Sequence, residues 1–263
     1  MSDANYYDRF NDSNNQQNKS FKEVSSKSST AYSLTKVFGY MFIGILITAA
    51  IALGLGAWFN YALLQNVSPD EDLFATNAVI LIVLLIVSGI GILILSFVVP
   101  ITMARGKHSI LVPSIIYTVL MGIMLSSIAA FIPWYLLGIT FGITSLIFGL
   151  MSLIAFLSKG KLNGLAIAAI GLFVGAGFIA LFMFVLMLMG VNVTFLYWIV
   201  SMATFAAMML ITIWDLARIK DIAKNGEMTN NLSLYCAYIL YNDFIYILLR
   251  VLRIVLIVAG NKK

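Results

Sequence analysis

From residue 37 onward, the chain alternates long apolar segments with short polar connections. Single apolar segments run from about 37 to 64, from about 74 to 102 and from about 232 to 259, and two longer runs cover 110–157 and 165–214. A helix over residues 110–157 would measure about 72 Å at about 1.5 Å per residue, against a hydrocarbon core of about 30 Å. Each longer run must therefore turn back once, near Pro133-Trp134 and near Gly190–Thr194.

Composition places these segments in a membrane. Hydrophobic residues make up 62% of the 263 residues and charged residues only 10%, whereas a soluble domain has about 25% charged residues. Prolines are few and the aliphatic runs are long, which favours helices over the short alternating strands of an outer-membrane barrel. The sequence therefore predicts an all-α integral membrane protein with seven transmembrane helices over residues 37–260.

The two ends of the chain differ from its middle. Residues 1–36 are rich in Asn, Gln, Ser and Lys and poor in aliphatic side chains, so they cannot bury enough apolar surface to fold. We expect a disordered cytoplasmic tail there, not a signal peptide. We expect a short basic end over residues 261–263.

Basic residues occur on alternate connections, which predicts the orientation. The first connection is acidic, and the third and fifth contain no Lys or Arg. The positive-inside rule then places the N-terminus in the cytoplasm, and the lack of organelle signals favours a bacterial plasma membrane. Lys262-Lys263 breaks the alternation, so the last segment either crosses fully or is re-entrant; we favour a full crossing. The basic residues assigned to the cytoplasm are Lys19, Lys22, Lys27, Lys36, Arg105, Lys107, Lys159, Lys161, Arg218, Lys220 and Lys224.

Several kinds of chemistry lack the residues that they need. The net charge of +5 is scattered over short loops, which does not indicate a nucleic-acid partner. His108 and Cys236 are the sole residues of their types, so they cannot build a zinc site. A serine protease would need a histidine within a span, and the one histidine lies in a loop. We expect no enzyme activity and no cofactor.

Two carboxylates, Asp215 and Asp243, lie in consecutive apolar segments. A charged side chain at membrane depth costs about 2.5–3.5 kcal/mol on insertion scales, so a partner charge, a cavity or an ion path must offset it. The two segments form an antiparallel hairpin in which the depths of the aspartates match to within about 6 Å. We expect one shared site that titrates as a coupled unit. Ionised together, the pair offers oxygen ligands to Ca²⁺, too few for tight binding and better suited to passage.

A purely structural role for these aspartates is the alternative. Asp215 lies one turn from Arg218, and Asp243 lies seven residues from Arg250 on the same helix face, so each could form an ion pair within its own helix. The other possible partner charges or latches are Arg105, at the end of the second segment, and Arg253.

The end of the chain also contains a distinctive group of motifs: Trp214-Asp215 followed by Ile219, Leu240-Tyr241 before Asp243-Phe244-Ile245, and Leu252-Arg253. This group resembles the Bax inhibitor family, also called the transmembrane Bax-inhibitor-motif family, and its bacterial members in particular. The sequence departs from the family pattern at Trp214, Asn242, Tyr246 and Arg250.

The resemblance implies a central seventh helix wrapped by six others and a pH-sensitive Ca²⁺ leak. It implies that Asp215 and Asp243 act as a di-aspartyl sensor, with Arg105 as the nearest match to an arginine that locks one carboxylate in the closed form. The partners expected are the lipid bilayer and Ca²⁺, and a monomer is favoured over an obligate oligomer. The alternatives are a non-conducting regulator of a membrane protease or of a stress or death pathway, and a secondary transporter.

The predicted orientation can be tested by labelling. Cysteine introduced at Asp70 should react with an impermeant thiol reagent in intact cells, whereas cysteine at Ser26 should react only after the membrane is opened. Labelling of intact cells at Ser26 but not at Asp70 would invert the topology.

Overall fold

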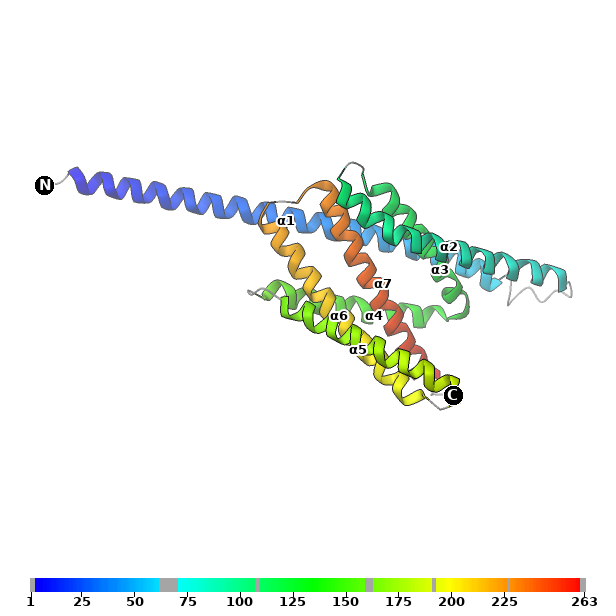
Figure 1. Ribbon diagram of the computed structural model, residues 1–263. Helices are drawn as coiled ribbons and strands as arrows, with labels where there is room; N and C mark the ends of the chain where they lie inside the picture. The colour runs from blue at the N-terminus through cyan, green and yellow to red at the C-terminus, as the bar shows by residue number, and fades with distance from the viewer. Residues whose placement is uncertain are drawn as a thin grey trace.

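The computed structural model describes residues 3–61, 71–106, 109–158, 163–190, 193–226 and 228–260, with side chains described from Ser29 onward except at 71–76. These residues form helices only (Figure 1). His108 and the predicted basic end over 261–263 lie outside the described residues. The helices are α1 (Asp3–Asn60), α2 (Glu71–Arg105), α3 (Leu111–Phe131), α4 (Trp134–Leu157), α5 (Asn163–Leu188), α6 (Thr194–Lys224) and α7 (Asn230–Gly260).

Both predicted turns inside the long apolar runs are confirmed. α3 ends at Phe131 and α4 begins at Trp134, and the intervening Pro133 suits a helix start because it has no backbone N–H to satisfy. α5 ends before Gly190, whose φ of 76° lies in the left-handed region that glycine adopts without a steric penalty.

The first helix begins earlier than the sequence predicted. α1 starts at Asp3, inside the segment predicted to be a disordered tail through residue 36. Over its last part, residues 29–36, the helix is tied to the rest of the molecule. Leu34 packs against the core, and the Lys36 ammonium donates a hydrogen bond to the side-chain oxygen of Asn230 at the start of α7. These two contacts concern the last part of the polar segment only.

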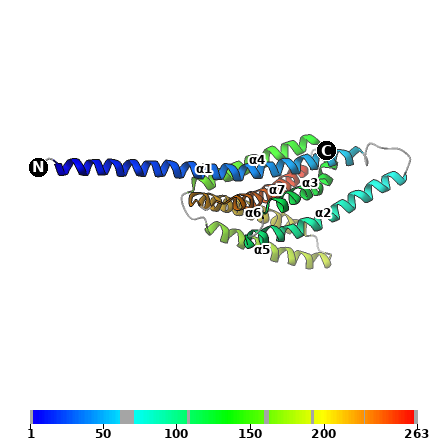
Figure 2. The same ribbon diagram turned by 90° about the horizontal axis from the view of Figure 1, so that it is seen from above.

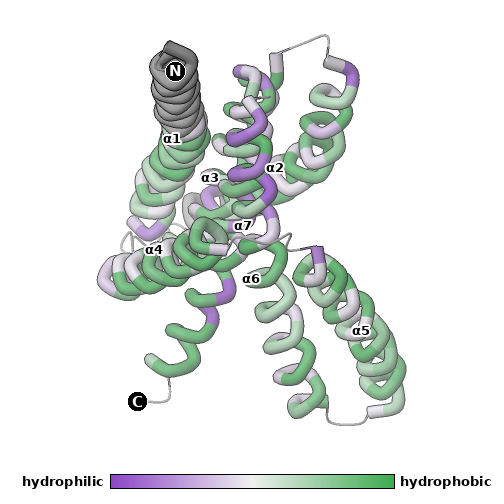
Figure 3. The backbone as a smooth tube through the Cα atoms, turned by 90° about the vertical axis from the view of Figure 1, so that its left-hand side faces the viewer, coloured by the Kyte–Doolittle hydropathy of each residue, from purple (hydrophilic) through white to green (hydrophobic). Residues whose placement is uncertain are grey.

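Six of the described helices are long and apolar enough to cross a membrane, and α7 is the exception. α7 has sufficient length, but it contains Asp243 near its middle and Arg250 and Arg253 in its second half. Figure 3 shows hydrophilic positions along α7, whereas α5 is largely hydrophobic. The six spans are Ser29–Asn60, Asn77–Arg105, Leu111–Phe131, Trp134–Leu157, Asn163–Leu188 and Thr194–Lys224.

α7 provides much of the buried core. It packs against α1, α4 and α6 and contacts α2 and α3 over shorter stretches, while α5 packs on α6. In Figure 1, α7 runs downward from beside α1–α3 and crosses α4, and in Figure 2 it lies near the middle of the helices, next to α6. Leu240 and Ile247 are fully buried, and the Phe244 ring meets Phe141 and Phe148 edge-on, with centroids 5.6 and 5.7 Å away. A helix that contains three charged residues therefore contributes many of the buried side chains.

α1 and α3 approach each other closely through glycine. A Cβ added at Gly122 would lie 2.8 Å from the Ile51 Cβ and 3.0 Å from the Thr48 carbonyl oxygen. A Cβ at Gly56 would lie 2.8 Å from the Ala129 Cβ. Small residues at such crossings let helix backbones pack together where no hydrophobic effect drives them.

Gly122→Ala should therefore destabilise the protein, because the crowding atoms belong to a backbone and a branched side chain that cannot move aside. Overpacking of this kind costs about 1–3 kcal/mol, seen as a lower Tm in detergent. Gly149→Ala in α4 is the matched control, since nothing lies within 4 Å of the added methyl group. Equal Tm values for the two variants would contradict the close approach.

Candidate functional site

The hairpin of α6 and α7 brings Asp215 and Asp243 together. Each side chain is only 8% exposed, and the carboxylate of Asp215 lies close enough to act electrostatically on Asp243. Thr212, one turn before Asp215 and fully buried, lies within hydrogen-bonding reach of Asp243. The structure thus assembles the two sequence-predicted carboxylates into one buried site.

One oxygen of Asp243 is not satisfied. Its Oδ2 is buried and has no hydrogen-bond partner among the described residues. Thr212 has a single hydroxyl proton, and its Oγ1 already lies 2.9 Å from the Met208 carbonyl oxygen. If the proton goes to Met208, the Thr212 oxygen can only accept, and only a protonated Asp243 can then bond to it. An ionised Asp243 would lack compensation, and a buried charge without partners is costly.

Arg218 is the cation that acts on Asp215. Its guanidinium is exposed and lies 5.3 Å from the centroid of the Trp214 ring. The predicted proximity of Arg218 and Asp215 within α6 therefore holds. Trp214 holds the arginine beside the site by a cation–π contact.

The other predicted partner charges lie elsewhere. Arg250 donates from Nη1 to the Ser201 hydroxyl at 3.1 Å and from Nη2 to the Thr204 hydroxyl at 2.9 Å. It thus bonds to α6 and not to Asp243 on its own helix. Arg253 lies over the Tyr197 ring, 5.0 Å from its centroid. Arg105 is exposed at the end of α2 and, within the described part of the chain, takes no part in the interactions of either carboxylate.

The site supplies few ligands for a resident metal ion. No group of three or more His, Cys, Asp or Glu side chains gathers among the described residues. Ca²⁺ takes six to eight oxygen ligands in a stable site. Two carboxylates and a hydroxyl can therefore offer transient coordination to a cation but no closed cage.

Lys220 holds α6 against the end of α4, a role that the sequence did not indicate. Lys220 donates to the carbonyl oxygens of Phe156 and Ser158 at 2.7 and 2.8 Å, and to Ala155 at 3.3 Å. These carbonyls end α4 and have no partner within that helix, so a cation is favoured there. Only the fold reveals this role, because Lys220 lies 62 to 65 positions away from these three residues in the sequence.

A second polar cluster, on the face of α7 toward α1 and α3, was also not predicted. The Tyr117 hydroxyl donates to the Asn242 side-chain oxygen at 2.7 Å, and Asn242 donates to the Tyr238 carbonyl at 3.1 Å. Thr48 and Tyr241 share a hydrogen bond of 2.6 Å between their hydroxyls. Uncharged polar residues in apolar segments were the available signal, since each needs a partner within a membrane.

Comparison with known proteins gives a consistent picture. The family model described as "Inhibitor of apoptosis-promoting Bax1" matches residues 30–260. The chain is 28% identical over 235 residues to "Inner membrane protein YbhL" of Escherichia coli K12, covering 88% of this chain and 92% of that protein. It is 26% identical over 236 residues to "Uncharacterized protein RP147" of Rickettsia prowazekii, covering 88% of this chain and 89% of that protein. No solved structure matches the chain.

Tyr117→Phe should lower stability, because it leaves the side-chain oxygen of Asn242 without its donor. Side-chain hydrogen bonds between membrane helices contribute about 0.6 kcal/mol on average and up to about 1.7, so a modest fall in Tm in detergent is expected. Tyr135→Phe is the control, since Tyr135 is 66% exposed. An unchanged Tm in Tyr117→Phe would show that this hydrogen bond does not stabilise the packing of α3 on α7.

Proposed function

This chain belongs to the Bax inhibitor family of membrane proteins, and we propose that it is a passive, pH-sensitive leak for Ca²⁺. Asp215 and Asp243 are then both the pH sensor and transient ligands of the moving ion. Ca²⁺ is the transported ion and not a cofactor, and the protein catalyses no reaction. The name of the relative YbhL supports a bacterial inner membrane as the location.

One observation carries the proposal: two carboxylates are buried side by side on neighbouring helices, and one oxygen of Asp243 has no partner among the described residues. A structural ion pair would satisfy that oxygen. An unsatisfied acidic pair at membrane depth is instead typical of a proton or ion path.

The proposed arrangement in the membrane has seven spans, with α7 as the central one. The length of α7, about 46 Å at about 1.5 Å per residue, exceeds the hydrocarbon core of about 30 Å. Its charges all contact groups on α6, which lowers the cost of crossing. Lys36 contacts Asn230, and Lys220 contacts the end of α4. Both contacts join parts of the chain that we assign to the cytoplasmic side.

We envisage gating as a change in one shared proton. With a proton on the pair, the carboxylates hold each other through a hydrogen bond and offer no site for a divalent cation. When the proton leaves, two adjacent negative charges repel and also provide oxygen ligands for Ca²⁺. Arg105 is exposed away from the pair, so no arginine of α2 captures the freed carboxylate. Flux should therefore rise with pH.

Ca²⁺ flux into liposomes that contain purified protein tests this mechanism. Wild-type flux should increase as pH rises, and Asp215→Asn and Asp243→Asn should each flatten the profile, because a single carboxylate has no neighbour to couple with. The double variant should resemble either single variant, since both substitutions disrupt one unit. Wild-type pH profiles in both single variants would rule out the shared site.

Asp221→Asn is the matched control, because Asp221 is an exposed aspartate on the same helix. Its pH profile should equal that of the wild type. Absence of flux from well-folded wild-type protein at every pH would favour a non-conducting regulatory protein, and saturable, ion-coupled flux would favour a secondary transporter.

A further inference from the structure

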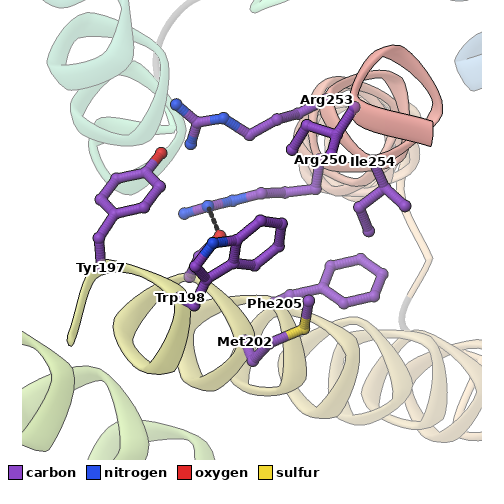
Figure 4. Close-up of a pocket in the computed structure, with 9 residues that line it drawn as sticks. Tyr197, Trp198, Met202, Phe205, Arg250, Arg253 and Ile254 are labelled. Atoms are coloured by element: carbon purple, nitrogen blue, oxygen red, sulfur yellow. Dashed lines mark hydrogen bonds between the residues drawn. The ribbon is translucent and has the colours of Figure 1, made fainter. Parts of the chain in front are cut away.

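Two arginines of α7 share a pocket with aromatic residues of α6. Arg250 and Arg253 line it together with Tyr197 and Trp198. Figure 4 shows both guanidinium groups extending from α7 across α6 toward the two aromatic rings. The rest of the lining includes the apolar side chains of Met202, Phe205, Ile254 and Ile257.

Among the residues that the structure describes, no acidic side chain pairs with these guanidinium groups. Arg250 bonds only to the neutral hydroxyls of Ser201 and Thr204, and Arg253 faces the ring of Tyr197. Residues 163–190 and 193–214 contain no Asp or Glu, and neither do residues 244–260. A guanidinium has five N–H donors, so most donors of the two arginines remain available.

The position along α7 identifies the surroundings of the pocket. Arg250 lies about 30 Å along α7 from Asn230, at about 1.5 Å per residue, and this distance is the thickness of the hydrocarbon core. In the proposed arrangement with seven spans, on which this inference rests, the pocket therefore sits where the far end of α7 reaches the opposite membrane surface. Tyr197 and Trp198, in the first turns of α6, are the residue types enriched at that depth.

The pocket itself has room for little more than one water molecule, about 20 Å³, but the same two guanidinium groups also line an open hollow of about 440 Å³ with Met208, Tyr246 and Leu249. We propose that Arg250 and Arg253 bind the phosphate of an anionic phospholipid there. Arginine forms paired, charge-assisted hydrogen bonds with phosphate oxygens. Free phosphate offers the same oxygens but has no apolar group that could contact the apolar lining. Ile254 and Met202, which are 38% and 47% exposed, extend the pocket along the helices where an acyl chain would lie.

Fluorescence quenching of Trp198 by brominated lipids tests the proposal. The protein is reconstituted in phosphatidylcholine with either brominated phosphatidylglycerol or brominated phosphatidylcholine. Quenching that the wild type shows and Trp198→Phe lacks comes from Trp198, so it reports on the pocket. Wild type should prefer phosphatidylglycerol. Arg253→Gln should reduce that preference about fivefold, equivalent to about 1 kcal/mol for one arginine near the surface.

Two variants separate the pocket from general charge. Arg253→Lys should retain part of the preference, and Lys224→Gln, which removes an exposed cation at the other end of α6, should retain all of it. Equal quenching of wild type by the two lipids, or an undiminished preference in Arg253→Gln, overturns the proposal. Loss of the preference on addition of inorganic phosphate assigns the pocket to a soluble anion and overturns it as well.

Discussion

The carboxylates of Asp215 and Asp243 are buried close to each other, so the ionisation of either carboxylate is costly. An isolated charge in such a place would favour exposure to water or pairing with a cation. Here Thr212 reaches one carboxylate and Arg218 acts on the other. The packing of α6 against α7 sets how close these groups lie to one another, so the rest of the bundle has to hold the two helices in a fixed relation.

The helices around α7 meet that requirement in different ways. On one side, α1 and α3 come together through glycines, and hydroxyls of Thr48 and Tyr117 bond to polar residues of α7. On the other side, the ring of Phe244 packs among the rings of α4. α7 therefore combines polar contacts and close aromatic packing, which explains how a helix that contains Asp243, Arg250 and Arg253 forms so much of the core.

Local chemistry explains which features the sequence could predict. Pro133 and Gly190 act through their own backbones, so the turns next to them were predictable, and the apolar runs were predictable from composition. The ion pair of Arg250 with Asp243 that spacing along α7 allowed is not found among the described residues, because the hydroxyl partners of Arg250, Ser201 and Thr204, belong to another helix. The bonds from Lys220 to the end of α4 and from Lys36 to Asn230 also join different helices, and neither was predicted. Partners chosen across helices depend on rotation and depth, which a single sequence does not encode locally.

Lys220 has a mechanical consequence for α6. Its ammonium is bonded to the last carbonyls of α4, while Ser201 and Thr204, about five turns away at 3.6 residues per turn, are bonded to Arg250 of α7. α6 is thus hydrogen-bonded near each end to a different neighbouring helix. Asp215 lies between these two sets of hydrogen bonds. A shift of the whole of α6 along its axis would break both sets, whereas a bend of α6 between them would break neither. We therefore expect Asp215 to move relative to Asp243 by bending of α6.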